Sequence, residues 1–480
     1  MIDVLIIGCG IVGASAAYEL ARYNLSTLVV EKLNDIAGET TRANSGLIHA
    51  GFDPEPDTAM AKLNVRGNVL ARELCEKLNV HFKQNGAFVV GFDENDKAVI
   101  EKLFQRGIKN RVPGLEIISG DVARELEPRL SGDVVCALHA PTASIVSPWD
   151  FAVALAETAA RNGAKFTLNA EVTAIEKIDE GYKVFTTKGD FETKVVVNAA
   201  GLYADAVHGF LKESDFKITP SRGQYYLLDK SAGNVVSRTI FQCPNEFGKG
   251  IMVTPTVHGN LLIGPSSEHV DARDNFVTDS ETLSHVWQTA AKSVPGLNLR
   301  ENIRNFAGVR AIADVDDFII REAAENFYDL AGIKSPGLTA APAIAQELIF
   351  MMKSSGFELT RKSKFMDKRE VVQFRYLNGK ERAELIRNNP TYGRIVCRCE
   401  SITEGEILEA FNSPIPPTTV DGIKRRCHAG MGRCQGGFCL PRIIELISKQ
   451  FNITPSEVLK DREGSHIITG VKGVCTCQPK

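Results

Sequence analysis

Apolar runs and a glycine-rich turn alternate over the first thirty residues. Residues 3–8 are almost entirely apolar, which is typical of a parallel strand buried on both faces. After a turn at 8–13, apolar positions recur at helical spacing over 14–23, and a second apolar run follows at 26–30. The pattern predicts a strand, a tight turn, a helix and a second strand.

The turn has the spacing G-x-G-x-x-G, formed by Gly8, Gly10 and Gly13, and the second strand ends at Glu31. Such glycines allow a tight turn, a close approach of backbone to a pyrophosphate, and close packing of helix on strand. The free N–H groups at the helix start bind the pyrophosphate, and the acid binds a ribose hydroxyl. We therefore expect a dinucleotide site here.

The next segment favours a flavin over a nicotinamide. Residues 38–51 are rich in Gly, Ser, Thr and Asn, and include the steps 44–46 (Asn-Ser-Gly) and 49–51 (His-Ala-Gly). A nicotinamide-binding fold would soon continue with another regular unit. A polar segment of this kind is typical of the loop that runs along a flavin.

Strands are predicted at 223–228 and 259–264, where apolar runs are bounded by turn residues. Thr339 is expected to cap a helix that starts near Ala340. Residues 356–394 are charged, hold few long apolar runs, and are interpreted as a connector.

The C-terminal part predicts a small helical module. Thr403 and Glu406 have the spacing of a capping box ahead of an apolar-periodic segment. A second helix is expected to hold Pro441 early and to end near Phe451. Thr454 is expected to cap a short last helix.

Size and charge restrict the function classes. With 480 residues, two or three domains are expected. The net charge of −3 argues against a nucleic-acid partner. No apolar run is long enough to span a membrane, and the first residues lack the basic and cleavage-site features of a secretion signal, so we expect a cytoplasmic protein. A peripheral link to a membrane through a partner stays open.

Seven of the eleven cysteines fall in the last 90 residues. Cys397 and Cys399 are separated by 34 residues from Cys434, which Cys439 follows closely. Four thiolates in two close pairs suit an iron–sulfur cluster, and the C-x-C spacing makes structural zinc the weaker alternative. The other cysteines are interpreted as core thiols (Cys9, Cys75, Cys136, Cys243), a spare thiol (Cys427) and a pair of open role (Cys475, Cys477).

Several motifs resemble those of one enzyme family. Residues 44–46, 49–51, 195–201, 307–310 and 332–339 resemble, in order, segments of the D-amino-acid-oxidase superfamily of FAD enzymes. The branch that they resemble holds glycerol-3-phosphate dehydrogenases and L-2-hydroxyglutarate oxidases. The cysteine segment resembles the bacterioferritin-associated-ferredoxin-like [2Fe-2S] domain attached to the catalytic subunit of anaerobic glycerol-3-phosphate dehydrogenase.

The resemblance implies an α/β fold with a Rossmann-like FAD-binding lobe interleaved with an α+β substrate lobe, followed by a small helical [2Fe-2S] domain. The expected boundaries are 1–355 for the oxidoreductase (FAD lobe 1–80, 145–215 and 300–355; substrate lobe 80–145 and 215–300), 356–394 for the connector, 395–462 for the [2Fe-2S] domain and 463–480 for a tail.

The resemblance also implies roles for individual residues. His49 would be the catalytic base and Arg310 the cation that holds an anionic substrate, unless Arg310 forms a structural ion pair with Asp314 or Asp316. His258 and Lys334 are weaker candidates for substrate contact. The expected FAD-binding residues are Gly8, Gly10, Gly13, Glu31, Thr41, Asn44, Ser45, Gly46, Val172, Gly201, Gly308, Gly337, Leu338 and Thr339, and the expected cluster ligands are Cys397, Cys399, Cys434 and Cys439.

The first functional hypothesis is an FAD-dependent dehydrogenase of sn-glycerol 3-phosphate that passes electrons through the [2Fe-2S] cluster to a partner subunit. An L-2-hydroxyglutarate or other 2-hydroxy-acid dehydrogenase is the alternative within the enzyme class. An electron-relay subunit without its own substrate is the alternative from another class. We also expect an oligomer.

Overall fold

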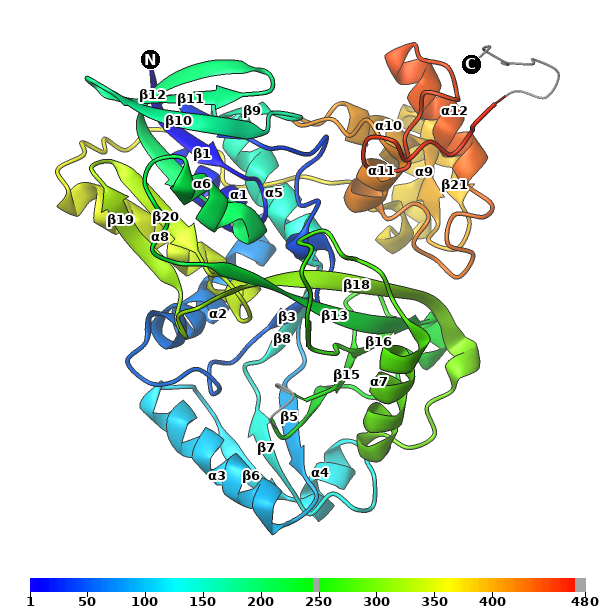
Figure 1. The fold of residues 1–480 in the computed structure, drawn as a ribbon. Coiled ribbons are helices and arrows are strands. Elements are labelled where there is room, and N and C mark those ends of the chain that lie inside the picture. Colours follow the sequence, from blue (N-terminus) through cyan, green and yellow to red (C-terminus); the bar gives the residue numbers. More distant parts are fainter. Residues whose placement is uncertain (245–249, 471–480) are drawn as a thin grey trace, which may run out of the picture. The chain divides into compact units, whose positions relative to one another are not determined.

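The computed structural model describes residues 1–244 and 250–470, which divide into two compact units. The large unit comprises Met1–Lys32 and Ile36–Arg369. The small unit comprises Leu33–Asp35 and the chain from Glu370 onward. Figure 1 shows the elements of both, and each unit is described by itself.

The first sheet of the large unit is built around the N-terminal strand. β1 (Ile2–Ile7) lies between β12 (Gly189–Asn198) and β2 (Thr27–Val30), and both run parallel to it. The last four residues of β1 are buried, as the apolar run predicts. The other strands of this eight-stranded sheet are β9 (Lys165–Thr167), β10 (Val172–Ile178), β11 (Gly181–Thr186), β19 (Ile319–Ala324) and β20 (Phe327–Ala331).

Helices pack closely beside this sheet. α1 (Ile11–Leu20) follows the glycine turn, contacts β1 and β2, and packs against α5 (Pro148–Arg161) and α8 (Gly337–Ser354). Fully buried alanines such as Ala14 and Ala17 keep α1 slim enough for these contacts. α8 also packs against α2 (Ala59–Lys77), and α6 (Ala204–Gly209) follows β12.

The second sheet of the large unit has nine strands. β13 (Ile218–Leu228) and β18 (Asn302–Ala313) form its longest antiparallel pair. The other strands are β5 (Ala87–Gly91), β6 (Glu116–Ser119), β7 (Cys136–Ala140), β14 (Thr239–Gln242), β15 (Met252–Pro255), β16 (Leu261–Gly264) and β17 (Glu268–His269).

Three helices belong to the second sheet, and a third, small sheet completes the unit. The helices are α3 (Glu94–Lys109), α4 (Gly120–Leu126) and α7 (Ser280–Ser293). The small sheet consists of β3 (Leu47–Ile48), β4 (Phe82–Gln84) and β8 (Ser144–Val146). Short 3₁₀ helices of the large unit lie at Thr40–Arg42, Gly201–Tyr203, Lys230–Ala232 and Leu299–Glu301. Those of the small unit lie at Phe374–Tyr376 and Pro390–Gly393.

The interleaved sheets agree with the expected fold class, but β18 lies in the other lobe. The sequence interpretation gives 300–355 to the FAD lobe, whereas β18 is hydrogen-bonded along β13 in the second sheet. β19, β20 and α8 do lie with the first sheet. Periodicity identifies a strand without saying which sheet it joins, so this long-range pairing was not readable from the sequence.

The small unit has its own apolar core. β21 (Ile395–Cys397) and β22 (Ile402–Thr403) form a two-stranded sheet. Its helices are α9 (Gly379–Asn388), α10 (Glu404–Phe411), α11 (Val420–Cys427) and α12 (Leu440–Phe451). The capping box of Thr403 and Glu406 and the helix with Pro441 in its first turn are confirmed.

Residues 379–388, which belong to the interpreted connector, form α9, and the compact unit already begins at Glu370. One expectation for this part of the chain was wrong. Thr454 starts a turn rather than a helix: its N–H and hydroxyl both bond to the Glu457 carboxylate. A threonine with an acid three residues later can close a single turn as well as cap a helix, and Asn452 in the left-handed conformation has already ended α12.

The close packing of α1 on β1 makes Gly13 intolerant of a side chain. A Cβ there would lie 2.0 Å from the Gly8 carbonyl oxygen. We expect Gly13→Ala to lower the free energy of unfolding by about 1–3 kcal/mol, because helix and strand must move apart. Chemical unfolding followed by circular dichroism measures this. Gly209→Ala in α6 is the matched control, since a Cβ there meets nothing within 4 Å; equal losses in both variants would contradict the packing argument.

Candidate functional site

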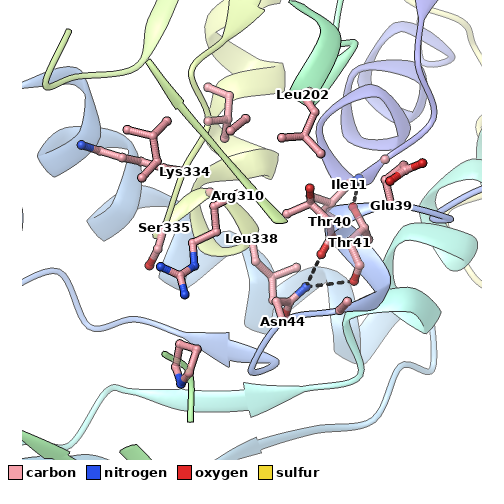
Figure 2. Close-up of a pocket in the computed structure, with 18 of the residues that line it drawn as sticks. Ile11, Glu39, Thr40, Thr41, Asn44, Leu202, Arg310, Lys334, Ser335 and Leu338 are labelled. Carbon is pink, nitrogen blue, oxygen red and sulfur yellow. Dashed lines mark hydrogen bonds between the residues drawn. The ribbon is translucent and has the colours of Figure 1, made fainter. Parts of the chain in front are cut away.

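A cavity of about 1150 Å³ lies in the large unit, and segments of both its large sheets line it. Its walls come from the ends of β1 and β12, the start of α1, the 39–49 segment, the second half of β18 and the start of α8. Figure 2 shows Arg310, Lys334 and Ser335 on one side of this space and Ile11, Glu39 and Thr41 on the other.

The start of α1 faces the cavity. Gly10 and Ile11 line it, and the Ile11 N–H donates to Thr41 Oγ1 at 2.9 Å. A Cβ on Gly10 would lie 3.1 Å from that hydroxyl oxygen. The glycine therefore keeps the helix N-terminus open, and Thr41 ties it to the neighbouring loop.

Glu31 is placed as a ribose-binding acid should be. The Cys9 N–H donates to Glu31 Oε2 at 2.7 Å, and the carboxylate lines the cavity although the residue is only 8% exposed. Gly8 adopts a φ of +95°, and a Cβ on it would lie 2.6 Å from the Ala199 carbonyl oxygen. The turn is thus fixed by backbone contacts that only glycine allows.

Asn44 organises the polar loop. Its Nδ2 donates to the Thr40 and Thr41 carbonyls at 3.1 and 2.9 Å (Figure 2). Its Oδ1 accepts from the Gly46 N–H at 2.8 Å. The side chain closes the loop on itself. Its role is therefore to shape the cavity wall in addition to any contact with a ligand.

The same loop is joined to β18. Thr40 Oγ1 donates to the Val309 carbonyl at 2.6 Å, and a Cβ on Gly308 would lie 1.8 Å from the Ala43 carbonyl oxygen. This contact sets the position of Arg310, two residues further along β18. Gly308, expected to bind the cofactor, does not line the cavity itself and acts as a spacer for the loop.

A buried polar network stabilises the turn after β12. Asn198 Nδ2 donates to Asp329 Oδ1 at 2.9 Å and to the Ala204 carbonyl at 2.8 Å. Asp329 Oδ2 lies 2.7 Å from His208 Nδ1. All three side chains are fully buried. The turn at Ala199–Gly201, which lines the cavity, is thus fixed without any ligand.

His49 points its ring nitrogen toward the start of α8. Its Nε2 lies 3.2 Å from Ser335 Oγ, and its ring stacks against Phe241 with centroids 6.2 Å apart. The His49 N–H donates to Thr339 Oγ1 at 2.9 Å. Backbone and ring are both held, so the imidazole has a defined direction into the cavity.

The expectation that Thr339 caps a helix from Ala340 was wrong. α8 already begins at Gly337, and Pro336 occupies the N-cap position without a side-chain cap. The Thr339 hydroxyl instead bonds to the backbone of the 47–49 segment. Its side chain is used for a contact between distant segments, which local sequence signals do not reveal.

Arg310 faces the cavity from β18. Its guanidinium donates to the Ser266 carbonyl at 2.5 Å and to Ser267 Oγ at 3.3 Å. Across the strand pair, a Cβ on Gly223 would lie 2.2 Å from Arg310 Nη2, so the glycine leaves room for the guanidinium. Within the described residues Arg310 forms no ion pair with Asp314 or Asp316, which removes the structural alternative.

Two neighbours modify the charge around Arg310. Lys334 forms an ion pair with Asp316 at 2.6 Å and lines the cavity. Burial raises the pKa of Tyr225, and the nearby Arg310 charge opposes that rise. Tyr225 is therefore a neutral hydrogen-bonding group at neutral pH, whereas Arg310, without an ion pair among the described residues, supplies a positive charge suited to an anion.

The structure brings together most of the residues predicted from sequence. Those that line the cavity are Gly8, Gly10, Glu31, Thr41, Asn44, Ser45, His49, Val172, Gly201, Arg310, Lys334, Gly337 and Leu338. Gly13, Gly46, Gly308 and Thr339 lie behind the lining and support it. His258 is not among the lining residues; its ring lies against His81 and Trp149, with centroids 5.1 and 6.2 Å away.

Sequence reasoning gave no role to Ser335, Tyr225 or Phe241, all of which line the cavity. Ser335 lies in the 332–339 segment, which was noted for its resemblance to FAD enzymes and not for a role of this serine. Tyr225 and Phe241 lie on strands of the second sheet, where apolar runs read as core. Only the three-dimensional structure shows that these two side chains line the cavity.

The four predicted cluster ligands meet in the small unit. Cys399 and Cys434 are exposed, with their Sγ atoms 3.7 Å apart. Cys397 and Cys439 are buried and interact through their thiols, and this contact lowers the pKa of Cys397 below its usual value. Backbone N–H groups of Gly430 and Gly436 also point at thiols of the group. Four thiols with amide donors form the ligand set that an iron–sulfur cluster requires.

Other residues of this segment have different roles. Cys427 is buried in α11 and its thiol bonds to the Ile423 carbonyl at 3.3 Å; burial raises its pKa to about 12. The Arg426 guanidinium bonds to Asp35 Oδ2 at 2.6 Å, so Arg426 stabilises the fold rather than the cluster thiols. Cys475 and Cys477 lie outside the described residues.

Comparison with known proteins agrees with this geometry. The family description "FAD dependent oxidoreductase" (DAO) matches residues 3–351, and "BFD-like [2Fe-2S] binding domain" matches residues 395–449. The chain belongs to the FAD dependent oxidoreductase family. It is an FAD-dependent enzyme with a C-terminal [2Fe-2S] domain, which confirms the expected family, fold class and cofactors.

Relatives show how far the likeness extends. A glycerol 3-phosphate dehydrogenase of Caloramator mitchellensis is 47% identical over 98% of both chains. An L-2-hydroxyglutarate dehydrogenase of Indibacter alkaliphilus is 30% identical over 71% of this chain and 96% of its own. The structure of L-alpha-glycerophosphate oxidase from Mycoplasma pneumoniae with FAD bound has a TM-score of 0.74 and 33% identity, over 77% of this chain and 99% of its own.

The cavity fits FAD. The open helix start at Gly10 and Ile11 suits a pyrophosphate, and Glu31 suits a ribose hydroxyl. The start of α8 presents the positive end of a helix to the same space.

A search for membrane spans among the helices of the described residues finds none with the length and hydropathy required.

A buried charge cluster stabilises the small unit and generates a pH prediction. Burial raises the pKa of Asp35, but Arg426 and Arg425 outweigh burial and hold the pKa below its usual value. At pH 7 we expect Asp35→Asn to lower the free energy of unfolding by about 3–5 kcal/mol, because two buried guanidinium groups lose their carboxylate. The loss should shrink as pH falls below about 4, because the carboxylate of the unfolded wild-type chain then takes up a proton, and it should vanish once pH falls below the lowered pKa of the folded Asp35 carboxylate.

Urea unfolding of the full chain at several pH values, followed by circular dichroism, measures this difference. Asp421→Asn is the control, because its partner Lys460 is half-exposed and such pairs contribute about 0–1 kcal/mol. A loss in Asp35→Asn that does not change with pH would contradict the assignment to the carboxylate charge.

Proposed function

We propose that the protein is an FAD-dependent dehydrogenase that oxidises sn-glycerol 3-phosphate to dihydroxyacetone phosphate. The observation that carries the proposal is the pairing of a held imidazole, His49, with a cavity-facing guanidinium, Arg310, in one FAD-type cavity. The relative named glycerol 3-phosphate dehydrogenase, which matches nearly the whole chain, supports the choice of substrate.

The reaction removes two hydrogens from a secondary alcohol. FAD, when bound, accepts a hydride from the carbon that carries the hydroxyl group. His49 Nε2 takes the hydroxyl proton, and an imidazole suits this task because its pKa lies near neutral pH. Ser335, 3.2 Å from the same nitrogen, orients the ring and can share the proton. The products are the ketone, the reduced cofactor and a protonated base.

Arg310 would hold the substrate phosphate. Its planar guanidinium can bind two oxygens of a phosphate at once. In the structure it is directed by Ser266 and Ser267 and carries no paired acid among the described residues. Lys334 adds a second cation that Asp316 partly neutralises. A carboxylate would bind the same arginine, which is why a 2-hydroxy acid is the second candidate, favoured by the Indibacter relative.

The [2Fe-2S] domain would provide the outlet for electrons. A cluster of this kind carries one electron at a time, so the two electrons of each turnover would leave singly for a separate electron-accepting protein. An oxidase that uses dioxygen at the flavin needs no such domain. We therefore propose a dehydrogenase with a protein partner.

Anaerobic titration of the purified enzyme with glycerol 3-phosphate and with L-2-hydroxyglutarate tests the substrate. We expect glycerol 3-phosphate to bleach the visible flavin absorbance at lower concentration than 2-hydroxyglutarate. The reverse order would favour the hydroxy acid. Bleaching by neither compound would exclude both dehydrogenases and favour an electron-relay subunit.

Replacing the proposed base gives a second prediction. His49→Ala should slow flavin reduction by glycerol 3-phosphate by about 100-fold or more, because proton removal loses its acceptor. Stopped-flow absorbance under anaerobic conditions measures the rate. His269→Ala, at an exposed position on β17, should leave it unchanged. An unaltered rate in His49→Ala would remove His49 from this role.

A further inference from the structure

The four cluster ligands differ in their access to solvent. Cys399 and Cys434 are exposed and 3.7 Å apart, whereas Cys397 and Cys439 are buried and contact each other. Each iron of a [2Fe-2S] cluster takes two thiolates. These two contacts would place Cys399 and Cys434 on one iron, and Cys397 and Cys439 on the other, when a cluster is bound. One side of the cluster site therefore faces solvent and the other faces the core.

An exposed aromatic side chain lies beside the solvent-facing pair. Phe438, between Cys434 and Cys439 in sequence, is 59% exposed. The Arg398 guanidinium lies over its ring, 4.4 Å from the centroid. In the sequence, Arg398 lies between the ligand candidates Cys397 and Cys399. Phe438 is not part of the apolar core of this unit. An exposed apolar ring of this kind can mark an interaction site.

The exposed charge of the ligand loops is positive. Residues 394–403 and 428–443 contain one acidic residue, Glu400, which is buried and paired with Arg375. Arg394 and Arg442 are both paired with Glu404. Arg398 makes no ion pair among the described residues, and Arg433 is exposed beside Cys434. The face around Cys399 and Cys434 thus combines an apolar ring with positive charge.

We propose that the face formed by Arg398, Cys399, Cys434 and Phe438 is the docking surface for an acidic electron-accepting protein. The inference rests on the proposed function, in which electrons leave through the cluster, and adds where they leave and what kind of surface receives them. Phe438 supplies a desolvated apolar contact, Arg398 selects carboxylates, and the exposed thiolate pair gives the shortest route. One electron leaves the reduced cluster and one acceptor centre gains it; no bond is made or broken.

The test uses the full-length holoenzyme, reduced with dithionite and then freed of it. Its reoxidation is measured by stopped flow with the soluble domain of cytochrome b5, an acidic one-electron acceptor, and with cytochrome c, a basic one. Electron paramagnetic resonance of the reduced cluster follows the same samples. We expect the rate with cytochrome b5 to fall as salt concentration rises, because opposite charges steer the encounter.

Arg398→Gln should slow the reaction with cytochrome b5 by about 10-fold at low salt and leave the reaction with cytochrome c unchanged or faster. Arg398→Lys should keep most of the rate, and Arg387→Gln, at an exposed arginine of α9, should keep all of it. Phe438→Ala should slow the reaction with cytochrome b5 while its salt dependence stays the same, because an apolar contact is lost.

The proposal is overturned if Arg398→Gln reacts with cytochrome b5 as the wild type does, or if the two cytochromes respond alike to that substitution. Iron content and the resonance spectrum show whether each variant keeps its cluster. If Phe438→Ala loses it, the three arginine variants decide alone. Since dithionite supplies the electrons, the result does not depend on glycerol 3-phosphate: failure to bleach the flavin would remove the substrate and leave the docking face standing.

Discussion

Direct contact between backbones at glycines is the constraint on which the cavity depends. At Gly13, Gly67 and Gly308 an added Cβ would lie 2.0, 2.1 and 1.8 Å from a carbonyl oxygen of another segment. These contacts join α1 to the turn after β1, α2 to the start of α8, and β18 to the 40–43 loop. Because these backbone contacts fix the segments around the cavity, they also fix the polar groups that those segments present to it. The FAD site is therefore built before any ligand arrives.

A site of this kind separates binding from chemistry. Backbone groups at the start of α1 and the Glu31 carboxylate suit a dinucleotide. His49 and Arg310, proposed for proton removal and anion binding, come from segments that the glycine contacts hold at the other side of the cavity. The buried network of Asn198, Asp329 and His208 supports the turn between these parts. With these proposed roles, a few side chains would decide the substrate without altering the dinucleotide-binding turn, which agrees with relatives named for glycerol 3-phosphate and for L-2-hydroxyglutarate.

Local patterns in the sequence predicted what is determined locally. The β1–α1–β2 start, the capping box at Thr403 and the cysteine spacing all depend on residues close together in the chain, and each was found where expected. The position of β18 and the use of Thr339 were mispredicted, because both depend on partners about 90 or 290 residues away. Ser335 and Phe241 became visible as site residues only once the fold brought their segments to the same cavity.

The three-residue segment Leu33–Asp35 has a consequence for how this protein can be divided. It is part of the small unit, although it lies just after Glu31 in a stretch that otherwise belongs to the large one. A fragment cut at Glu370 would carry all four proposed cluster cysteines and yet lack the carboxylate that Arg425 and Arg426 share. The small unit is thus discontinuous in the chain: its fold is completed by residues synthesised more than 300 positions before the rest of it.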